Sequence, residues 1–293
     1  MHRHVWLSLV CVLGILGTVP ILGRSGLQAG APQRIISLVP ALTEMLFAIG
    51  AGPQVAAVSS FDDFPLEAAA RPRVGALLDP DVERILSMRP DLVAIYGSQT
   101  DLRRQLQRAS IPIFDYRHAG LPDVLATIRS LGTATGRSTD AERVATDIER
   151  RLAAVRTRTA TTRRVRALLV FGRETGALRN MYVAGGRGFL HDMLVVAGAD
   201  NIVADVDRES VQATTELILA RQPDLILELR EGPVLTAAEV ARRVGDWAPL
   251  ASVPAVKNGR VRVLSGTGLL VPGPRVAAAV ERLADVIHPR ATP

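Results

Sequence analysis

The chain has 293 residues, a hydrophobic content of 48% and a net charge of +6, which is enough apolar sequence for two ordinary domains with packed cores. The basic character comes from arginine, because Lys257 is the only lysine, and the arginines are spread along the whole chain. No basic run with interleaved aromatic residues occurs, and this excludes the usual pattern of a nucleic-acid-binding protein.

Residues 1–31 read as a cleavable signal peptide. Arg3 precedes an apolar run from Val5 to Gly17, and small residues follow around Ala29. An uncleaved membrane anchor is the alternative, but the run is short for a membrane span. Cys11, the only cysteine, lies in this segment. The exported chain would therefore contain no thiol for a disulfide, a metal site or a nucleophile.

Residues 32–120 are expected to form a first α/β lobe. Apolar segments at 34–38, 54–59, 92–96 and 111–116 predict strands, and the segments between them predict helices at 43–49, 82–88 and 102–109. Near-continuous apolar strands that alternate with helices are typical of a parallel sheet covered on both faces.

Residues 121–162 are expected to connect the lobes. A helix is predicted over 122–131, with Gly132 and Gly136 as interruptions, and a long helix follows from Ser138 to about Arg156. Ser138 or Thr139 is expected to cap the long helix, with Glu142 at capping-box spacing. Its apolar stripe has helical spacing and comprises Ala141, Val144, Ala145, Ile148, Leu152 and Val155. A helix of about 28 Å would run along both lobes and limit hinge opening.

Residues 163–293 are expected to form a second α/β lobe with its own parallel sheet. Strands are predicted at 165–171, 202–203, 225–229 and 261–264, and helices at 189–197, 239–244 and 275–286. Three glycines, Gly185, Gly186 and Gly188, precede the first of these helices. Glycines in this position are expected to leave backbone N–H groups available to an anion.

One cassette occurs twice. Residues 83–96 read ERILSMRPDLVAIY and residues 216–229 read ELILARQPDLILEL, and they share Glu, Ile, Leu, Pro, Asp and Leu at equivalent positions. A weaker echo relates TEMLFAIGAG at 43–52 to HDMLVVAGAD at 191–200. Similarity at this spacing indicates two like lobes rather than a solenoid of short repeats. Two lobes form a cleft, which is the expected place for a ligand.

The strings RIISLVPALTEMLFAIGAG, SSFDDFP and RPRVGALLDPDVERILSMRPDLVAIY resemble the periplasmic substrate-binding proteins for cobalamin and iron complexes. These proteins are the soluble receptors of ABC importers. The resemblance covers roughly residues 33–288 and is greatest to the cobalamin-binding members. It implies two Rossmann-like lobes with parallel sheets, joined by one long backbone helix, with a ligand cleft between the lobes. It also implies a periplasmic monomer.

Ligands of open parallel sheets bind beyond the carboxyl ends of the strands. In the first lobe these ends carry Phe61, Phe64, Tyr96, Arg117 and His118. In the second lobe the end of the first strand and the Gly-rich segment after it supply Arg173, Arg179, Asn180, Tyr182 and Arg187. Flat rings suit the face of a macrocycle, and arginines suit carboxylate or phosphate groups. These ten residues are the predicted ligand-binding set, with core packing as the alternative for the aromatic members.

Cobalamin is the first choice of ligand, and a ferric siderophore or heme is the alternative. Leu77, Tyr96 and Ser210 stand at or near positions where a known cobalamin receptor has tryptophans, so the large rings of that receptor are absent. A cleft dominated by arginines would favour an anionic siderophore. Rings and amide partners would favour cobalamin, and a Tyr or His aimed at the centre would favour heme.

The first residue of each cassette copy, Glu83 and Glu216, has a second implied role. In the family one exposed glutamate on each lobe pairs with arginines of the ABC permease dimer, which works with ATPase subunits. A receptor with two like lobes needs one anion on each to meet a symmetric dimer. The alternative is simple stabilisation of a helix N-terminus by a carboxylate.

The sequence predicts no catalytic residue, no metal site and no cofactor. It contains no nucleophile elbow or phosphate loop. Asp62 and Asp63 are adjacent on an extended segment and point apart, so they do not form a catalytic pair. His118 and His191 stand outside any cluster with ligand spacing. A hydrolase or transferase on an α/β scaffold stays as the distant alternative.

Overall fold

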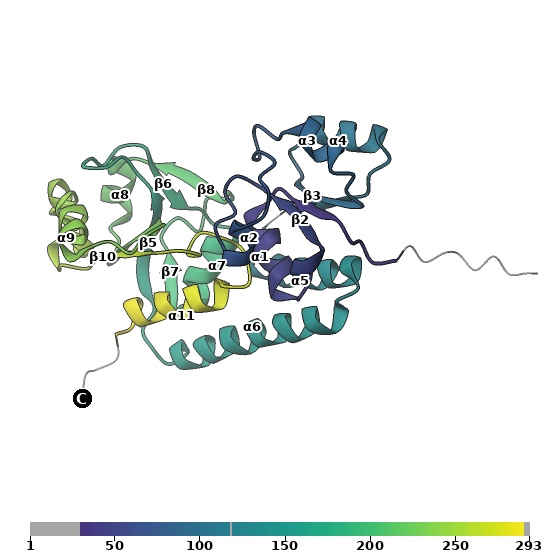
Figure 1. Cartoon of the computed structure of the whole chain (residues 1–293). Coiled ribbons are helices and arrows are strands. Elements are labelled where there is room, and N and C mark those ends of the chain that lie inside the picture. Colours follow the sequence, from purple (N-terminus) through teal and green to yellow (C-terminus); the bar gives the residue numbers. More distant parts are fainter. Residues whose placement is uncertain (1–29, 118, 290–293) are drawn as a thin grey trace, which may run out of the picture. The chain divides into compact units, whose positions relative to one another are not determined.

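The computed structural model describes residues 30–117 and 119–289, and the predicted signal peptide lies outside them except for its last two residues. Within this part the chain forms two α/β lobes, each built on its own sheet (Figure 1). The first sheet has the strand order β2-β1-β3-β4, and every pairing in it is parallel. Its strands are β1 Ile35–Ser37, β2 Val55–Val58, β3 Leu92–Tyr96 and β4 Ile113–Tyr116. The predicted parallel sheet of the first lobe is confirmed.

The second sheet is mixed. Its order is β10-β9-β5-β6-β8, with β7 paired to the first three residues of β5. The strands are β5 Val165–Gly172, β6 Met181–Ala184, β7 Ala199–Asn201, β8 Ser210–Ala213, β9 Leu225–Glu231 and β10 Val261–Gly266. Strands β5, β7, β9 and β10 pair in parallel, whereas β6 pairs antiparallel with β5 and β8.

The predicted parallel strands form the core of the second sheet, and β6 and β8 extend it with antiparallel pairings that the sequence did not predict. The segment that reads as a polar loop contains Met181, Tyr182 and Val183, which are buried, exposed and buried in turn. This alternation is the pattern of an antiparallel strand with one solvated face. The strand expected at 202–203 is displaced to β7, Ala199–Asn201.

The two copies of the cassette fold in the same way. Helix α3 (Val82–Ser87) precedes β3, and helix α8 (Thr215–Arg221) precedes β9. The residue two positions before each cassette glutamate caps its helix: the Asp81 carboxylate accepts from the Arg84 N–H, and the Thr214 hydroxyl accepts from the Leu217 N–H. Each side chain satisfies an N–H group that the first helical turn leaves unpaired.

Each cassette helix ends in the left-handed region without a glycine. Arg89 has φ of 46° and Gln222, its equivalent, has φ of 47°. The aspartate after the shared Pro of the turn then ties the chain to another strand of its sheet. The Asp91 N–H donates to Arg34 O, just before β1, and the Asp224 N–H donates to Arg166 O in β5. The duplication thus preserves a turn as well as a pattern of apolar residues.

Helix α5 (Leu121–Thr135) continues through Gly132, where an interruption was expected. A Cβ atom on Gly132 would overlap the Cβ of Ala141 on the next helix. The glycine therefore permits close packing of α5 on helix α6 rather than breaking α5. Gly136, with φ of 71°, does end the helix as a left-handed cap.

Helix α6 (Ser138–Thr159) has 22 residues and is about 33 Å long. Figure 1 shows it running along one side of both sheets, and it contacts α5, α7 (Phe189–Val196) and α11 (Val276–Ile287). The predicted long connector is confirmed, but its predicted cap is wrong. Arg137 is the N-cap residue and makes no side-chain cap, and Glu142 instead accepts hydrogen bonds from Arg129 on α5.

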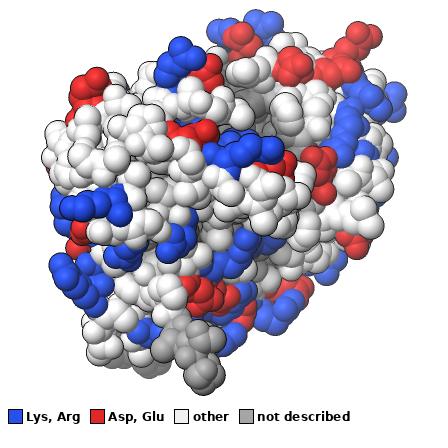
Figure 2. All heavy atoms as spheres, turned by 90° about the vertical axis from the view of Figure 1, so that its left-hand side faces the viewer, with Lys and Arg blue, Asp and Glu red and all other residues white. Residues whose placement is uncertain are grey.

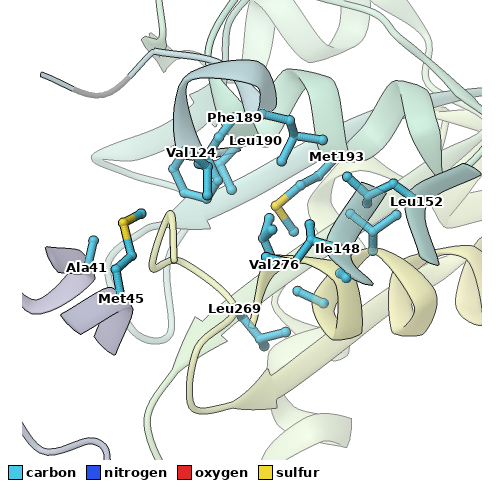
Figure 3. Close-up of a cluster of buried hydrophobic side chains, with 14 of the residues drawn as sticks. Ala41, Met45, Val124, Ile148, Leu152, Phe189, Leu190, Met193, Leu269 and Val276 are labelled. Carbon is cyan, nitrogen blue, oxygen red and sulfur yellow. The ribbon is translucent and has the colours of Figure 1, made fainter. Parts of the chain in front are cut away.

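One apolar core joins the lobes. Figure 3 shows Met45 of α1 (Pro40–Ala48), Met193 of α7, Leu152 of α6 and Val276 of α11 in one buried cluster. All four side chains are at most 2% exposed. Large separation of the lobes would expose this shared core, and the core therefore favours small hinge movements.

The remaining helices complete the two lobes: α2 Leu66–Ala69, α4 Thr100–Arg108, α9 Ala237–Gly245 and α10 Pro254–Lys257, with 3₁₀ turns at Gly52–Gln54 and Ala248–Leu250. Within residues 30–117 and 119–289, no helix combines the length and the apolar character that crossing a bilayer requires.

Candidate ligand-binding cleft

A pocket of 270 Å³ lies where strands of both sheets end. Its walls come from the segments that follow β1 and β2 in the first lobe and β9 and β10 in the second. The lining residues are Pro40, Glu44, Phe61, Asp62, Asp63, Phe64, Glu231, Gly232, Thr267, Val271 and Arg275. We call this the floor pocket. Its position at the carboxyl ends of parallel strands follows the rule for open α/β sheets.

A second pocket of 210 Å³ lies in the second lobe, after β5 and at the start of β8. It is lined by Phe171, Gly188, Phe189, Leu190, Glu209, Ser210 and Leu270. We call it the wall pocket. Both pockets are mostly apolar; the floor pocket has several carboxylates among its lining residues, and the wall pocket has one, Glu209.

Phe61 and Phe64 both line the floor pocket, and their rings are 70% and 45% exposed. Their loop is fixed by polar contacts: Asp62 Oδ2 accepts from the Ser59 N–H at 2.7 Å, and Arg73 donates to the carbonyls of Ser59 and Asp62 at 2.7 Å. A fixed loop with exposed rings loses little conformational freedom when a flat ligand covers it.

Tyr96 is half-buried at the end of β3. Its ring packs edge-on against the buried ring of Tyr116, with 5.8 Å between the ring centres. Burial raises the pKa of Tyr96, and the charge of Glu209 raises it further. Glu209 belongs to the second lobe. Arg117 is exposed and lies against Gly97, and His118 falls outside the described residues.

An ion pair crosses between the lobes at the floor pocket. Glu44 of α1 is 5% exposed, and its two carboxylate oxygens accept from Arg275 Nε at 2.8 Å and Nη2 at 2.5 Å. Arg275 is the N-cap residue of α11 without a side-chain cap, and its guanidinium lies 4.0 Å from the centre of the Phe64 ring. Burial raises the pKa of Glu44, and Arg275 opposes this rise. The pair therefore fixes both the lobe contact and one aromatic wall.

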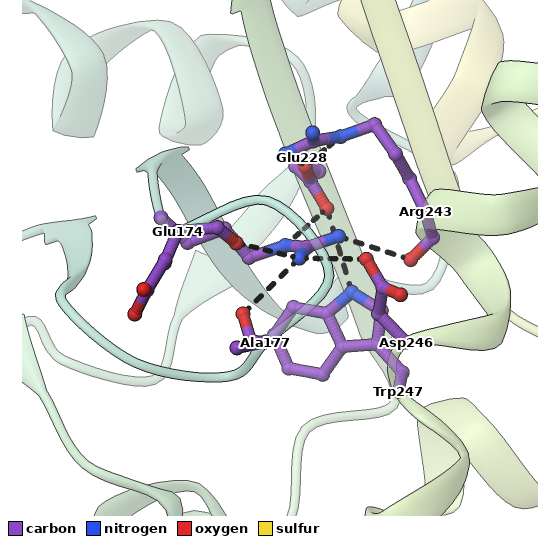
Figure 4. A network of polar contacts seen from close by, with 7 residues as sticks. Glu174, Ala177, Glu228, Arg243, Asp246 and Trp247 are labelled. Carbon is purple, nitrogen blue, oxygen red and sulfur yellow. Dashed lines mark hydrogen bonds and ion pairs between the residues drawn. The ribbon is translucent and has the colours of Figure 1, made fainter.

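Arg173 does not face the cleft, which corrects the sequence prediction. Its side chain has no exposed surface and donates to Glu228 at 3.0 Å, while Asp246 lies at 2.9 Å (Figure 4). Arg243 and the Trp247 ring nitrogen also donate to Glu228. A strand-end arginine is expected at a ligand, but here Glu228 on the neighbouring strand β9 draws it into the core.

The other predicted residues of the second lobe lie along β6 and its flanking turns, and none lines the floor or wall pocket. Arg179 is exposed and pairs with Glu174 at 3.2 Å, and Arg187 is exposed and lies 3.5 Å from Asp207. Asn180, with φ of 49°, forms the turn into β6. Tyr182 is exposed, with its ring 6.4 Å from that of Phe171.

The glycines before α7 do not form the expected anion site. The N–H groups of Gly185 and Gly186 donate to the carbonyls of Glu209 and Val206. A Cβ atom on Gly185 or Gly186 would overlap the carbonyl oxygen of Arg208 or Ala204. These glycines therefore permit close backbone approach, and their N–H groups are already used.

Glu83 and Glu216 are exposed near the N-termini of α3 and α8, and within the described part of the chain neither has an ion-pair partner. The pKa of Glu216 lies below its usual range because its own backbone N–H, and then the Thr214 and Thr215 hydroxyls, hydrogen-bond to the carboxylate. The face in Figure 2, which is the left side of Figure 1, carries arginines interspersed with acids.

Sequence reasoning missed Glu44, Glu231 and Arg275. Glu44 was detectable, because an acid on the buried face of an apolar helix requires a partner. Glu231 ends β9, and the strand-end rule applied to the second cassette would have found it. Arg275 had no local signal, since its role depends on a contact with Glu44 in the other lobe. In residues 30–117 and 119–289, no group of three or more His, Cys, Asp or Glu residues is suited to a metal ion.

Comparisons with known proteins agree with this architecture. The family model described as periplasmic binding protein matches residues 35–266. A vitamin B12-binding protein of Pectobacterium atrosepticum is 30% identical over 261 residues, which are 86% of this chain and 90% of that protein.

Two solved structures are similar over most of the chain. The crystal structure of the periplasmic vitamin B12 binding protein BtuF of Vibrio cholerae has a TM-score of 0.73 and 25% identity, covering 88% of this chain and 97% of that one. The periplasmic heme-binding protein RhuT from Roseiflexus sp. RS-1 has a TM-score of 0.71 and 26% identity, covering 87% and 98%. Because the family model spans more than half of the chain, the chain belongs to the periplasmic binding proteins, which are substrate-binding components of ABC importers and not enzymes.

Proposed function

We propose that this periplasmic binding protein captures cobalamin and delivers it to the permease of an ABC importer. The lining of the two pockets supports this ligand. The exposed rings of Phe61 and Phe64 line one pocket, the half-buried ring of Phe171 lines the other, and Arg275, the one arginine in the lining, is already paired with Glu44. Apolar rings suit the faces of a corrin. A carboxylate-rich siderophore would need free arginines, and the predicted Arg173 is buried elsewhere.

We expect cyanocobalamin to bind the mature protein in isothermal titration calorimetry, more tightly than hemin or ferric siderophores. Phe61→Ala should weaken cobalamin binding by about tenfold, because a ring that covers the ligand contributes about 1–2 kcal/mol. Val234→Ala removes an exposed apolar side chain that lines neither pocket, and it serves as the control. Clear binding of another chelate without heat from cobalamin would refute the proposed ligand.

We propose that Glu83 and Glu216 dock the two lobes onto the two permease subunits. They stand at equivalent positions of the duplicated cassette and are exposed. Rim charges of this kind contribute mainly to association rate and orientation.

Glu83→Ala combined with Glu216→Ala should slow association with permease in proteoliposomes by about tenfold or more, while the affinity for ligand stays unchanged. The matched control is Glu149→Ala, which removes an exposed glutamate from α6. Loss of ligand binding in the double variant, or unchanged association with the permease, would show that the docking role is wrong.

We further propose that residues 1–31 are cleaved on export and that the mature chain works as a monomer, with residues 32–120 and 163–293 as the lobes and 121–162 as the connector. The signal-like composition of residues 1–31 and the periplasmic setting of the relatives of this chain support export. The N-terminal sequence and the molar mass of the exported protein in solution test these assignments.

A further inference from the structure

The two pockets contain more acidic than basic residues. Glu44, Asp62, Asp63, Glu209 and Glu231 contribute carboxylates, whereas Arg275 contributes the one guanidinium in either lining. This contrasts with the chain as a whole, which carries a net charge of +6. The two linings therefore hold more acidic than basic groups on a basic protein, although Glu44 is paired with Arg275 and Glu231 accepts from the Gly268 and Leu270 N–H groups.

Arg275 is not available to a carboxylate on the ligand. Its Nε and Nη2 groups donate to Glu44, its Nη1 group donates to the Thr267 hydroxyl at 3.1 Å, and its plane lies over Phe64. A ligand carboxylate would have to displace Glu44, which would leave that carboxylate buried without its partner. Such a displacement is costly because a buried charge needs a counter-charge.

Asp62 adds an unused acceptor at the floor pocket. It is 1% exposed, and its Oδ1 atom has no hydrogen-bond partner within the described residues. The neighbouring Thr43 hydroxyl donates to Ser37 Oγ at 2.7 Å. Burial raises the pKa of Asp62, and hydrogen bonds of its carboxylate with Ser59 and Thr43 oppose the rise. A buried acceptor without a donor is destabilising, so a ligand amide N–H that reached Asp62 Oδ1 would relieve this cost.

We infer that the cleft selects metal chelates whose rim carries amides and rejects those whose rim carries carboxylates. The inference rests on the proposed function and narrows it to fully amidated corrinoids. The acidic lining repels carboxylate groups at short range, while neutral amides donate to it. Specificity then arises from repulsion of the wrong ligand as much as from attraction of the right one.

The test compares two corrinoids by calorimetry on the mature protein: cyanocobalamin, and a cobalt corrinoid whose peripheral amides are hydrolysed to carboxylates. The carboxylate form should bind at least 100-fold more weakly at low salt. The ratio of the two affinities should fall as salt increases, because salt screens exposed charges.

Asp63→Asn should reduce the ratio of the two affinities by about tenfold. The Asp63 side chain is 89% exposed at the floor pocket, and its carboxylate lies 3.7 Å from the Arg73 guanidinium. Asp147→Asn, on α6, is the control and should leave the ratio unchanged. Equal binding of both corrinoids would overturn the inference and leave the proposed function intact. Binding of neither would overturn the proposed function itself.

Discussion

Replacing Glu228 by glutamine is expected to lower the free energy of unfolding by about 3–5 kcal/mol, the usual cost of removing one partner from a buried charge network. Glu228 is 1% exposed and accepts from Arg173, Arg243 and Trp247 (Figure 4). Glutamine keeps the size of the side chain but leaves Asp246 as the remaining counter-charge for Arg173. Chemical denaturation monitored by circular dichroism measures the change.

The matched control is Glu142→Gln, which breaks the exposed pair with Arg129 on the connecting helices. An exposed pair contributes about 1 kcal/mol or less, so this variant should unfold almost as the parent does. A loss of less than about 1 kcal/mol for Glu228→Gln would contradict the view that Arg173 serves the core of the second lobe.

Arg275→Ala is expected to destabilise the protein by about 3 kcal/mol at pH 8, and by much less in acid. The pKa of Glu44 in the folded protein is already raised, so the stability from this group is full below its unfolded pKa and falls as the pH rises through the folded pKa. Removal of Arg275 takes away the group that lowers the pKa, and the pKa rises further. In the variant, the free energy of unfolding therefore keeps falling up to a higher pH. The difference in this free energy between parent and variant grows from acid to alkaline conditions.

Unfolding free energies of the parent, Arg275→Ala, Glu44→Gln and the double variant between pH 4.5 and 8 form a cycle that isolates the pair. The pH-dependent part of the difference should vanish when Glu44 is also replaced. A constant difference across this range, or one that shrinks towards alkaline pH, would show that Glu44 is not the titrating partner.

The duplicated cassette was sufficient to predict much of the fold, because it encodes local features. Leu92–Tyr96 is a strand over the predicted residues, and α3 and α8 both begin at side-chain caps two positions before the repeated glutamate. Capping, apolar periodicity and the left-handed turn are decided within a few residues, so they can be read from the chain.

The antiparallel strands β6 and β8 and the true members of the cleft were not predictable in the same way. Gly185 and Gly186 read as an anion site, but segment 204–209 occupies their N–H groups. Arg173 reads as a ligand contact, yet Glu228 and Asp246 in later segments bury it. Arg275 gains its role from Glu44, 231 residues away. Each error concerns a group whose partner is distant in sequence.

The aromatic prediction rested on topology, and the binding of a ligand by these residues stays a prediction. The rule that ligands bind beyond the carboxyl ends of strands selected Phe61 and Phe64, and both line the floor pocket. Tyr96, Arg117 and the exposed residues along β6 stay predictions, as does His118.

A crystal of the mature protein grown with cyanocobalamin, measured at the cobalt absorption edge, tests the central claim most directly. The account predicts one cobalt peak between the lobes, with the corrin covering Phe61 and Phe64 on one side and the segment from Thr267 to Val271 on the other. A cobalt peak confined to the outer surface, or a cleft occupied by a different chelate under competition, would contradict it.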